Sequence, residues 1–196
     1  KAENGKDVLA QIEKDVGIPF QILSQEEEGR VGFLSAKMLY PEVDENDLLV
    51  WDSGNGSFQI SAKVGDTYKI YQGPLGHGTV RVLLSKEIRG GKVLEGHVSG
   101  NPVQRDEAPQ VMQEIENLLP EIPSWLQEKL HSKKTVVATF GDGESIFALV
   151  SRALGKSSGD TIARLEVQNV LEMSLGRDDD FFDSSGLHRK TGTSAL

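Results

Sequence analysis

Residues 47–60 read Asp-Leu-Leu-Val-Trp-Asp-Ser-Gly-Asn-Gly-Ser-Phe-Gln-Ile, an apolar run that ends at Asp52 and leads at once into a glycine-rich turn. The apolar residues 48–51 predict a buried strand, and the alternating residues 57–62 predict a strand that returns beside it. Between them, the residues of Gly54-Asn55-Gly56 tolerate positive φ angles, so the pattern predicts a tight β-hairpin.

This hairpin has two interpretations. A tight turn points several backbone N–H groups at one spot, where they can hold a phosphoryl oxygen, and Asp52 at the strand end is placed to bind a divalent cation or to orient a water. An ordinary Asn-Gly hairpin requires the same residues. The stretch taken alone does not decide between a phosphate site and a plain turn.

Residues 20–33 read Phe-Gln-Ile-Leu-Ser-Gln-Glu-Glu-Glu-Gly-Arg-Val-Gly-Phe and contain a second candidate. We predict a strand at 20–23 and then Ser24 as the N-cap of a helix at 25–39, whose first turn carries three carboxylates. Carboxylates there stabilise a helix by a few tenths of a kcal/mol to about 1 kcal/mol, so compensation of the helix dipole explains the run. A catalytic role is the alternative interpretation.

A third candidate follows a predicted buried strand at 135–140, which leads through Gly141-Asp142-Gly143 into a predicted helix at 144–154. The unpaired N–H groups at a helix N-terminus favour an anion, and Ser145 can add a hydroxyl donor. A strand-to-helix turn capped by its aspartate explains the same pattern. The carboxylate of Glu144 would repel phosphate unless it faces away.

The remaining segments follow from the same patterns. We predict helices at 6–16, 105–119 and 125–131, a strand at 67–72, a glycine-rich loop at 90–102, a solvated acidic connector at 178–183 and a polar tail at 184–196 that drapes over the surface or is disordered. Three meander strands, then helix, strand and helix, predict an α/β fold.

Composition excludes several classes of protein. The chain of 196 residues has no Cys, which excludes a disulfide framework, thiolate zinc sites and a cysteine nucleophile. No apolar stretch approaches the length of a transmembrane helix, so we expect a soluble protein without a membrane partner, and we place it in the cytoplasm. The net charge of −9 and the absence of a basic stripe among aromatic residues argue against a nucleic-acid partner.

In order and spacing these segments resemble the Ppx/GppA phosphatases, the exopolyphosphatase and guanosine pentaphosphate phosphohydrolase family. That family carries the motif Ser-Gly-x-Glu-Glu-Ala-Arg-Leu and then the motif Asp-Ile-Gly-Gly-Gly-Ser-Thr-Glu. Residues 24–31 align with the first motif and residues 52–59 with the second, each without a gap. Residues 73–81 resemble a further family segment, Pro-Leu-Gly-x-Val-Arg, and residues 141–146 resemble the second glycine loop of the family.

The resemblance implies a lobe of the actin-like, sugar-kinase and Hsp70-ATPase (ribonuclease H-like) type, an α/β fold whose mixed sheet contains a three-strand meander flanked by helices. We expect residues 1–46 to be the end of a first lobe, residues 47–183 to be a second lobe and residues 184–196 to be a polar tail. The phosphate loop of the family's first lobe has no counterpart here, so we expect half of a cleft. The resemblance also allows a homodimer of the full-length parent.

The resemblance further implies hydrolysis of a terminal phosphoanhydride bond in polyphosphate or guanosine pentaphosphate, with Mg²⁺ as cofactor. Glu28 would orient or deprotonate the attacking water, and Asp52 would hold Mg²⁺ or the water. The implied phosphate-binding residues are Gly54, Asn55, Gly56 and Ser57 in one loop and Gly141, Gly143 and Ser145 in another.

Gln59 falls where the family has a catalytic-site glutamate. An amide cannot act as a base and binds Mg²⁺ less well than a carboxylate. The alternative function is therefore a phosphatase-like sensor that binds a phosphorylated nucleotide or polyphosphate without turnover. In either case we expect residues 1–196 alone to be inactive as a phosphatase.

Overall fold

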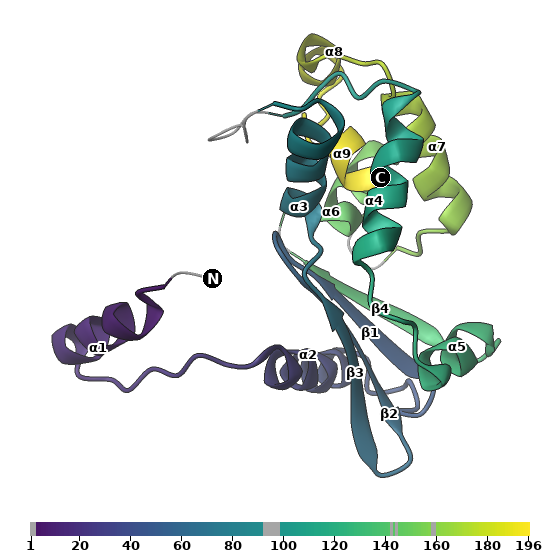
Figure 1. Cartoon of the computed structure of the whole chain (residues 1–196). Helices are drawn as coiled ribbons and strands as arrows, with labels where there is room; N and C mark the ends of the chain where they lie inside the picture. Colours follow the sequence, from purple (N-terminus) through teal and green to yellow (C-terminus); the bar gives the residue numbers. More distant parts are fainter. Residues whose placement is uncertain (1–2, 92–98, 142, 144, 158–159) are drawn as a thin grey trace.

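A four-stranded mixed sheet forms the centre of the computed structural model, which describes residues 3–91, 99–141, 143, 145–157 and 160–196 (Figure 1). The strands are β1 (Leu48–Ser53), β2 (Phe58–Val64), β3 (Thr67–Gly73) and β4 (Val136–Gly141), in the order β3-β2-β1-β4. The first three form an antiparallel meander, and β4 runs parallel to β1. The predicted α/β fold with a mixed sheet and a three-strand meander is confirmed.

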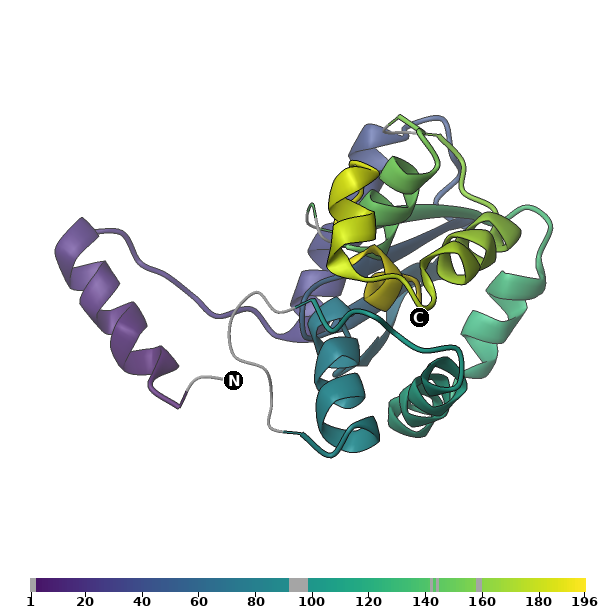
Figure 2. The same ribbon diagram turned by 90° about the horizontal axis from the view of Figure 1, so that it is seen from above.

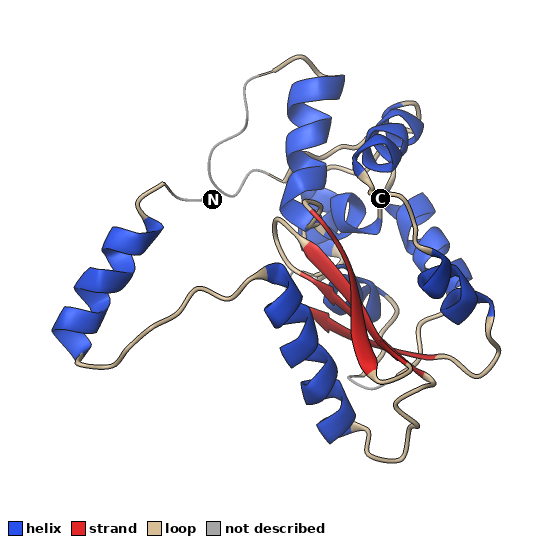
Figure 3. Ribbon diagram, turned by 60° about the horizontal axis from the view of Figure 1, so that its bottom comes forward, coloured by secondary structure: helices blue, strands red, loops and turns tan. Residues whose placement is uncertain are grey.

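Helix α2 (Gln25–Leu39) covers one face of this sheet (Figure 3). The side chains between them form one buried cluster, which contains Phe33, Ala36, Leu48, Val50 and Ala138. The opposite face packs against a second cluster, which contains Leu49, Phe58, Ala62, Tyr71, Leu75 and Leu126. Alternate residues of β1 therefore enter different cores, as the period of two in a strand requires.

The start of α2 brings that helix close to the sheet. A capping box between Ser24 and Glu27 fixes the first turn, and the predicted bounds of the helix are confirmed. A Cβ added at Gly29 would lie 3.1 Å from Cγ2 of Ile70 and 3.4 Å from Cβ of Gln59, so a small residue is needed at this crossing. The predicted lobe boundary after residue 46 lies between two elements, α2 and β1, that pack together.

A group of helices lies at one end of the sheet (Figures 1 and 2). It contains α3 (His77–Val82), which continues into the π-helical turn η1 (Leu83–Ile88), α4 (Glu107–Leu118), α6 (Ile146–Ala153), α7 (Arg164–Ser174), α8 (Asp179–Ser184) and α9 (Thr191–Ala195). Helix α5 (Ser124–His131) lies beside the sheet and buries Leu126 in its core. None of the helices in the described ranges has both the length and the apolar character needed to cross a membrane.

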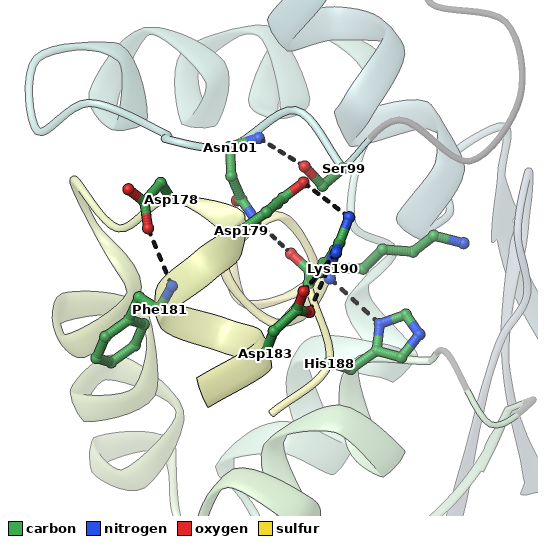
Figure 4. Close-up of polar contacts among 9 residues, drawn as sticks. Ser99, Asn101, Asp178, Asp179, Phe181, Asp183, His188 and Lys190 are labelled. Atoms are coloured by element: carbon green, nitrogen blue, oxygen red, sulfur yellow. Dashed lines mark hydrogen bonds and ion pairs between the residues drawn. The ribbon is translucent and has the colours of Figure 1, made fainter. Parts of the chain in front are cut away.

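The acidic residues 178–183 are not a solvated connector, and this prediction is wrong. Asp178 caps α8 by accepting a hydrogen bond from the N–H of Phe181, and Phe182 is completely buried (Figure 4). The guanidinium of Arg189 forms ion pairs with Asp179 and Asp183 of the same helix. A neutralising arginine therefore allows an acidic helix to pack.

The loop at residue 101 joins this polar cluster. The Asn101 side chain donates hydrogen bonds to Oδ1 of Asp179, at 2.9 Å, and to the backbone oxygen of Arg189, at 2.6 Å (Figure 4). Segments far apart in the sequence are thus held together by polar contacts. Most of the predicted glycine-rich loop at 90–102, namely residues 92–98, lies outside the described residues.

The prediction that residues 184–196 drape over the surface or are disordered is also wrong. Helix α9 packs against α3, α6 and α7, and Thr191 and Thr193 are at most 2% exposed. Their hydroxyls donate to the backbone oxygens of His188 and Lys190. These two threonine hydroxyls are therefore buried with partners in the same turn, whereas Oγ of Ser194 in the same helix is buried without a hydrogen-bond partner among the described residues.

Residues 20–23 do not form the predicted strand. They belong to the extended linker between α1 (Gly5–Val16) and α2, and in the described part of the chain no strand lies beside them (Figure 1). Ile22 is 61% exposed. The predicted end of α1 at Gly17 is confirmed, since this glycine adopts a φ of 72°.

Candidate phosphate site

Two of the predicted phosphate loops leave the sheet side by side. Ser53, the last residue of β1, is in register with Gly141, the last residue of β4, and the two strands are parallel. The carboxyl ends of parallel strands are where open α/β sheets bind ligands. The structure therefore brings residues 54–57 together with the start of the loop before α6. Asp142 and Glu144 lie outside the described residues.

The loop at residues 54–57 is held from within and by the first turn of α3. The N–H of Gly54 donates to the oxygen of Ser57 at 3.0 Å, and the N–H groups of His77 and Gly78 donate to the oxygens of Gly54 and Asn55. No residue between 54 and 57 has a positive φ, so the expected left-handed turn is not used. Contact with α3 shapes this loop in place of a left-handed turn.

The contact with α3 requires glycine for reasons of space. A Cβ at Gly76 would lie 2.3 Å from the oxygen of Gly54, and a Cβ at Gly78 would lie 2.2 Å from Oδ1 of Asn55. His77 between them is only 9% exposed. The Gly-His-Gly sequence was the only sign of this contact, and it does not identify the partner.

In the second loop, which precedes α6, the backbone at Gly141 also leaves no space for a side chain. A Cβ at Gly141 would lie 2.3 Å from Cβ of Ser145. The Ser145 hydroxyl accepts a hydrogen bond from the N–H of Ala148 and so caps α6, and the residue is 1% exposed. Gly143 is exposed, with no atom near its Cα on the side where a Cβ would stand. Ser145 thus orients the helix start, and Gly143 is open to a ligand.

The three predicted catalytic residues meet at the same end of the sheet. Gln59 Nε2 donates a hydrogen bond of 3.0 Å to Oε2 of Glu28, which links β2 to α2. Asp52 is directly opposite Gln59 in the β1–β2 register, so both side chains point to the face that α2 covers. Gln59 is 2% exposed, whereas Glu28 is exposed. The sequence pattern indicated each residue but not this hydrogen bond.

Asp52 has an unusual environment. Burial raises the pKa of its carboxyl above the ordinary value, and the carboxylate makes no hydrogen bond or ion pair with any described residue. A half-buried carboxylate without a partner is unfavourable for stability and is typical of sites that bind a ligand. It is therefore the strongest candidate in this site for contact with a cation or a water.

The carboxylates in the first turn of α2 have different roles. Oε2 of Glu27 accepts hydrogen bonds from the N–H and the hydroxyl of Ser24, each at 2.8 Å, and these bonds lower the pKa of Glu27. Glu28 contacts Gln59, and Glu26 makes no side-chain hydrogen bond to a described residue. Helix capping therefore explains Glu27, whereas Glu28 remains a candidate residue of the phosphate site.

The residues present fit Mg²⁺ only as a site with few protein ligands. No cluster of three or more His, Asp or Glu side chains arranged for a metal occurs among the described residues. Mg²⁺ commonly binds through one or two carboxylates, with waters and substrate phosphates completing its coordination. The unpartnered carboxylate of Asp52, beside the two loops, meets that requirement.

Solved structures identify the fold. The Aquifex aeolicus PPX-GPPA enzyme is 14% identical, with a TM-score of 0.65, over 99% of this chain and 60% of its own. An exopolyphosphatase-like protein is 15% identical, with a TM-score of 0.64, over 99% of this chain and 59% of its own. The sheet and its helices therefore form an α/β lobe of the actin-like ATPase class, as predicted.

Sequence comparison identifies the family. The model of the Ppx/GppA phosphatase family matches residues 1–185, and the chain belongs to this family of exopolyphosphatase-type phosphohydrolases. Exopolyphosphatase 1 of Mycobacterium bovis and of Mycobacterium tuberculosis are each 36% identical over 78 residues. These residues are 39% of this chain and 22% of each relative, so the chain matches about a fifth of their length.

Proposed function

We propose that this chain carries the catalytic carboxylates and two phosphate loops of an enzyme that releases orthophosphate from the end of polyphosphate or of guanosine pentaphosphate. The observation that carries the proposal is the Glu28–Gln59 hydrogen bond beside Asp52, at the edge where both loops leave the sheet. Membership of the Ppx/GppA family supports the same class of reaction.

Phosphoryl transfer requires neutralised phosphate oxygens, a water in line with the leaving group and a side chain that orients this water. In the described structure, the N–H groups of Asn55 and Gly56 make no hydrogen bond and can donate to phosphate oxygens. The exposed carboxylate of Glu28 can orient the water and accept its proton. Gly143 would contact a second phosphate, and Ser145, which is buried, would support this loop by capping α6.

Asp52 would hold the Mg²⁺, which when bound neutralises phosphate oxygens. Such local attraction is needed because the net charge of the chain, −9, repels a polyanion at long range. The same charge supports a function without nucleic acid, and we include a cytoplasmic location in the proposal.

The sensor remains a second candidate because of one observation. Gln59 places an amide, which cannot take a proton, at the centre of the site, where it contacts Glu28. A chain with this residue can bind polyphosphate or a phosphorylated nucleotide without hydrolysing it. Binding without turnover in the full-length gene product would favour this candidate.

Orthophosphate release from polyphosphate with Mg²⁺, measured for the full-length gene product, tests the proposal. We expect turnover that Asp52→Asn removes, and we expect residues 1–196 alone to show negligible turnover. Binding without release would support the sensor. The absence of both binding and release would contradict the proposed function, and robust turnover by residues 1–196 alone would contradict the expectation of half a cleft.

A further inference from the structure

We infer that Gln59 is a positioning residue that holds the carboxylate of Glu28 in its working orientation; the inference rests on the proposed function. Among the described residues, the bond from Gln59 Nε2 to Glu28 Oε2 is the only hydrogen bond between side chains that joins α2 to the sheet. The two side chains differ in how much they can move. Gln59 is buried within the sheet, whereas Glu28 is exposed on the surface of α2.

Gln59 is held firmly enough to act as the reference point. It pairs with Asp52 of β1 on one side and with Gln72 of β3 on the other, so backbone ladders flank it. Its Cβ lies 3.4 Å from the place where a side chain at Gly29 would begin, so α2 closes over it. With 2% exposure, the side chain has little room for other rotamers.

Glu28 has no comparable support. Its carboxylate makes no hydrogen bond to any other described residue, and a free glutamate side chain has three rotatable bonds. The amide of Gln59 satisfies Oε2 and leaves Oε1 without a described partner. Gln59 therefore determines which oxygen of Glu28 is presented to a water.

An amide suits this task better than a carboxylate would. The amide group donates hydrogen bonds, whereas an ionised carboxylate only accepts them. A glutamate at position 59 would bring a second negative charge within hydrogen-bond distance of Glu28. The departure from the family motif at this position therefore replaces repulsion between two carboxylates by a hydrogen bond between Gln59 and Glu28.

Two variants test the inference in the full-length gene product. Gln59→Met keeps the volume and removes the donor, and misplacement of the base should lower kcat on the order of 10²-fold with little change in KM. The double variant with Glu28→Ala should be no slower than Glu28→Ala alone. Gln72→Met is the matched control, because Gln72 lies opposite Gln59 on β3 and is exposed, and its kcat should be that of wild type.

If Gln59→Met has the kcat of wild type, with or without a lower Tm, the inference is overturned. It is also overturned if the fold-losses in kcat of Gln59→Met and Glu28→Ala multiply in the double variant. If the wild-type protein binds polyphosphate but releases no phosphate, the proposed hydrolysis fails separately. The NMR measurement on Glu28→Ala described below, which needs no turnover, then decides the positioning role.

A spectroscopic measurement does not depend on activity or on the folding of Gln59→Met. Glu28 is exposed, so Glu28→Ala leaves the core intact. In this variant of residues 1–196, the side-chain amide protons of Gln59 should shift in the NMR spectrum and exchange faster with solvent. Unchanged signals would show that the amide does not hold Glu28 and would overturn the inference.

Discussion

Asp52, the residue proposed to hold the cation, is expected to oppose stability. Burial raises its pKa in the folded state above that in the unfolded chain. Its contribution to stability is therefore present below the unfolded pKa and is lost as the pH rises through the folded pKa. Above the folded pKa the ionised carboxylate opposes folding, which is consistent with the cation-binding role proposed for it.

Asp52→Asn should accordingly stabilise the protein at pH 7. The substitution keeps the size of the side chain and removes the buried charge, so we expect a rise in Tm on the order of a few degrees. The difference from wild type should shrink as the pH falls towards 3, and the exposed Asp66→Asn should change little. A lower Tm for Asp52→Asn at pH 7 would show that the carboxylate has a stabilising partner.

Substitutions of Glu28 and Glu26 provide a matched comparison, also at the scale of single residues. In the full-length gene product, Glu28→Gln should lower kcat by about two to four orders of magnitude, because it removes the base. Glu26→Gln should have little effect, since in the described structure its side chain makes no hydrogen bond. Steady-state phosphate release measures both variants. Equal small effects would mean that the acidic turn only compensates the helix dipole.

At the scale of elements, the sequence predicts those whose local pattern agrees with their packing. Helix α2 and the meander strands have clear periodicity, and their predicted bounds agree with the structure to within two residues. Residues 20–23 have the composition of a strand but no partner strand. Helix α9 is buried although it has no apolar periodicity, and the hydroxyls of Thr191 and Thr193 bond within their own turn. Both features depend on tertiary contacts, which leave no pattern in the local sequence.

The site was predictable to the same degree. The glycine loops and carboxylates could be located by their order along the chain, but the docking of Gly76 and Gly78 on the first loop could not. That contact is visible only in three dimensions, where a Cβ added at either glycine would lie 2.2–2.3 Å from an atom of residues 54–55. The Gln59–Glu28 bond likewise joins residues 31 positions apart.

The tight approach of Gly141 to the start of α6 gives a prediction for this element. Gly141→Ala would place a Cβ 2.3 Å from that of Ser145, so we expect a loss of about 1–3 kcal/mol in the free energy of unfolding. Gly143→Ala is the control, because no atom lies within 4 Å of the added Cβ. Urea unfolding of both variants measures the difference. Equal stability of the two variants would contradict the described packing.

Helix α8 gives a prediction on pH. The hydrogen bonds of Arg189 lower the pKa of Asp183 in the folded state, so this pair stabilises the protein above the unfolded pKa and loses its effect as the pH falls through the folded pKa. Arg189→Gln should lower Tm at pH 7 but not at pH 2–3. Thermal unfolding across this range measures it. A pH-independent difference would mean that Arg189 acts by packing alone.

At the scale of the whole molecule, the sheet and α2 form one side of the proposed phosphate site, and both glycine loops lie at a single edge. Helix α1 and its linker extend away from this body and carry exposed apolar side chains, with Val16 and Ile18 each 56% exposed (Figure 2). The chain spans 60% of the Aquifex aeolicus enzyme in structure. Glu28, Asp52, Gln59 and the residues described in the two loops lie within this body.

The central claim is that phosphate binds between the loops at 54–57 and 141–145, beside Asp52. NMR titration of residues 1–196 with tripolyphosphate and Mg²⁺ tests it most directly, because it needs no turnover. We predict shifts of the backbone amides of Asn55, Gly56 and Gly143 that Asp52→Asn weakens. Shifts confined to other surfaces, such as the basic pair Lys133 and Lys134, or no shifts at all, would contradict the account.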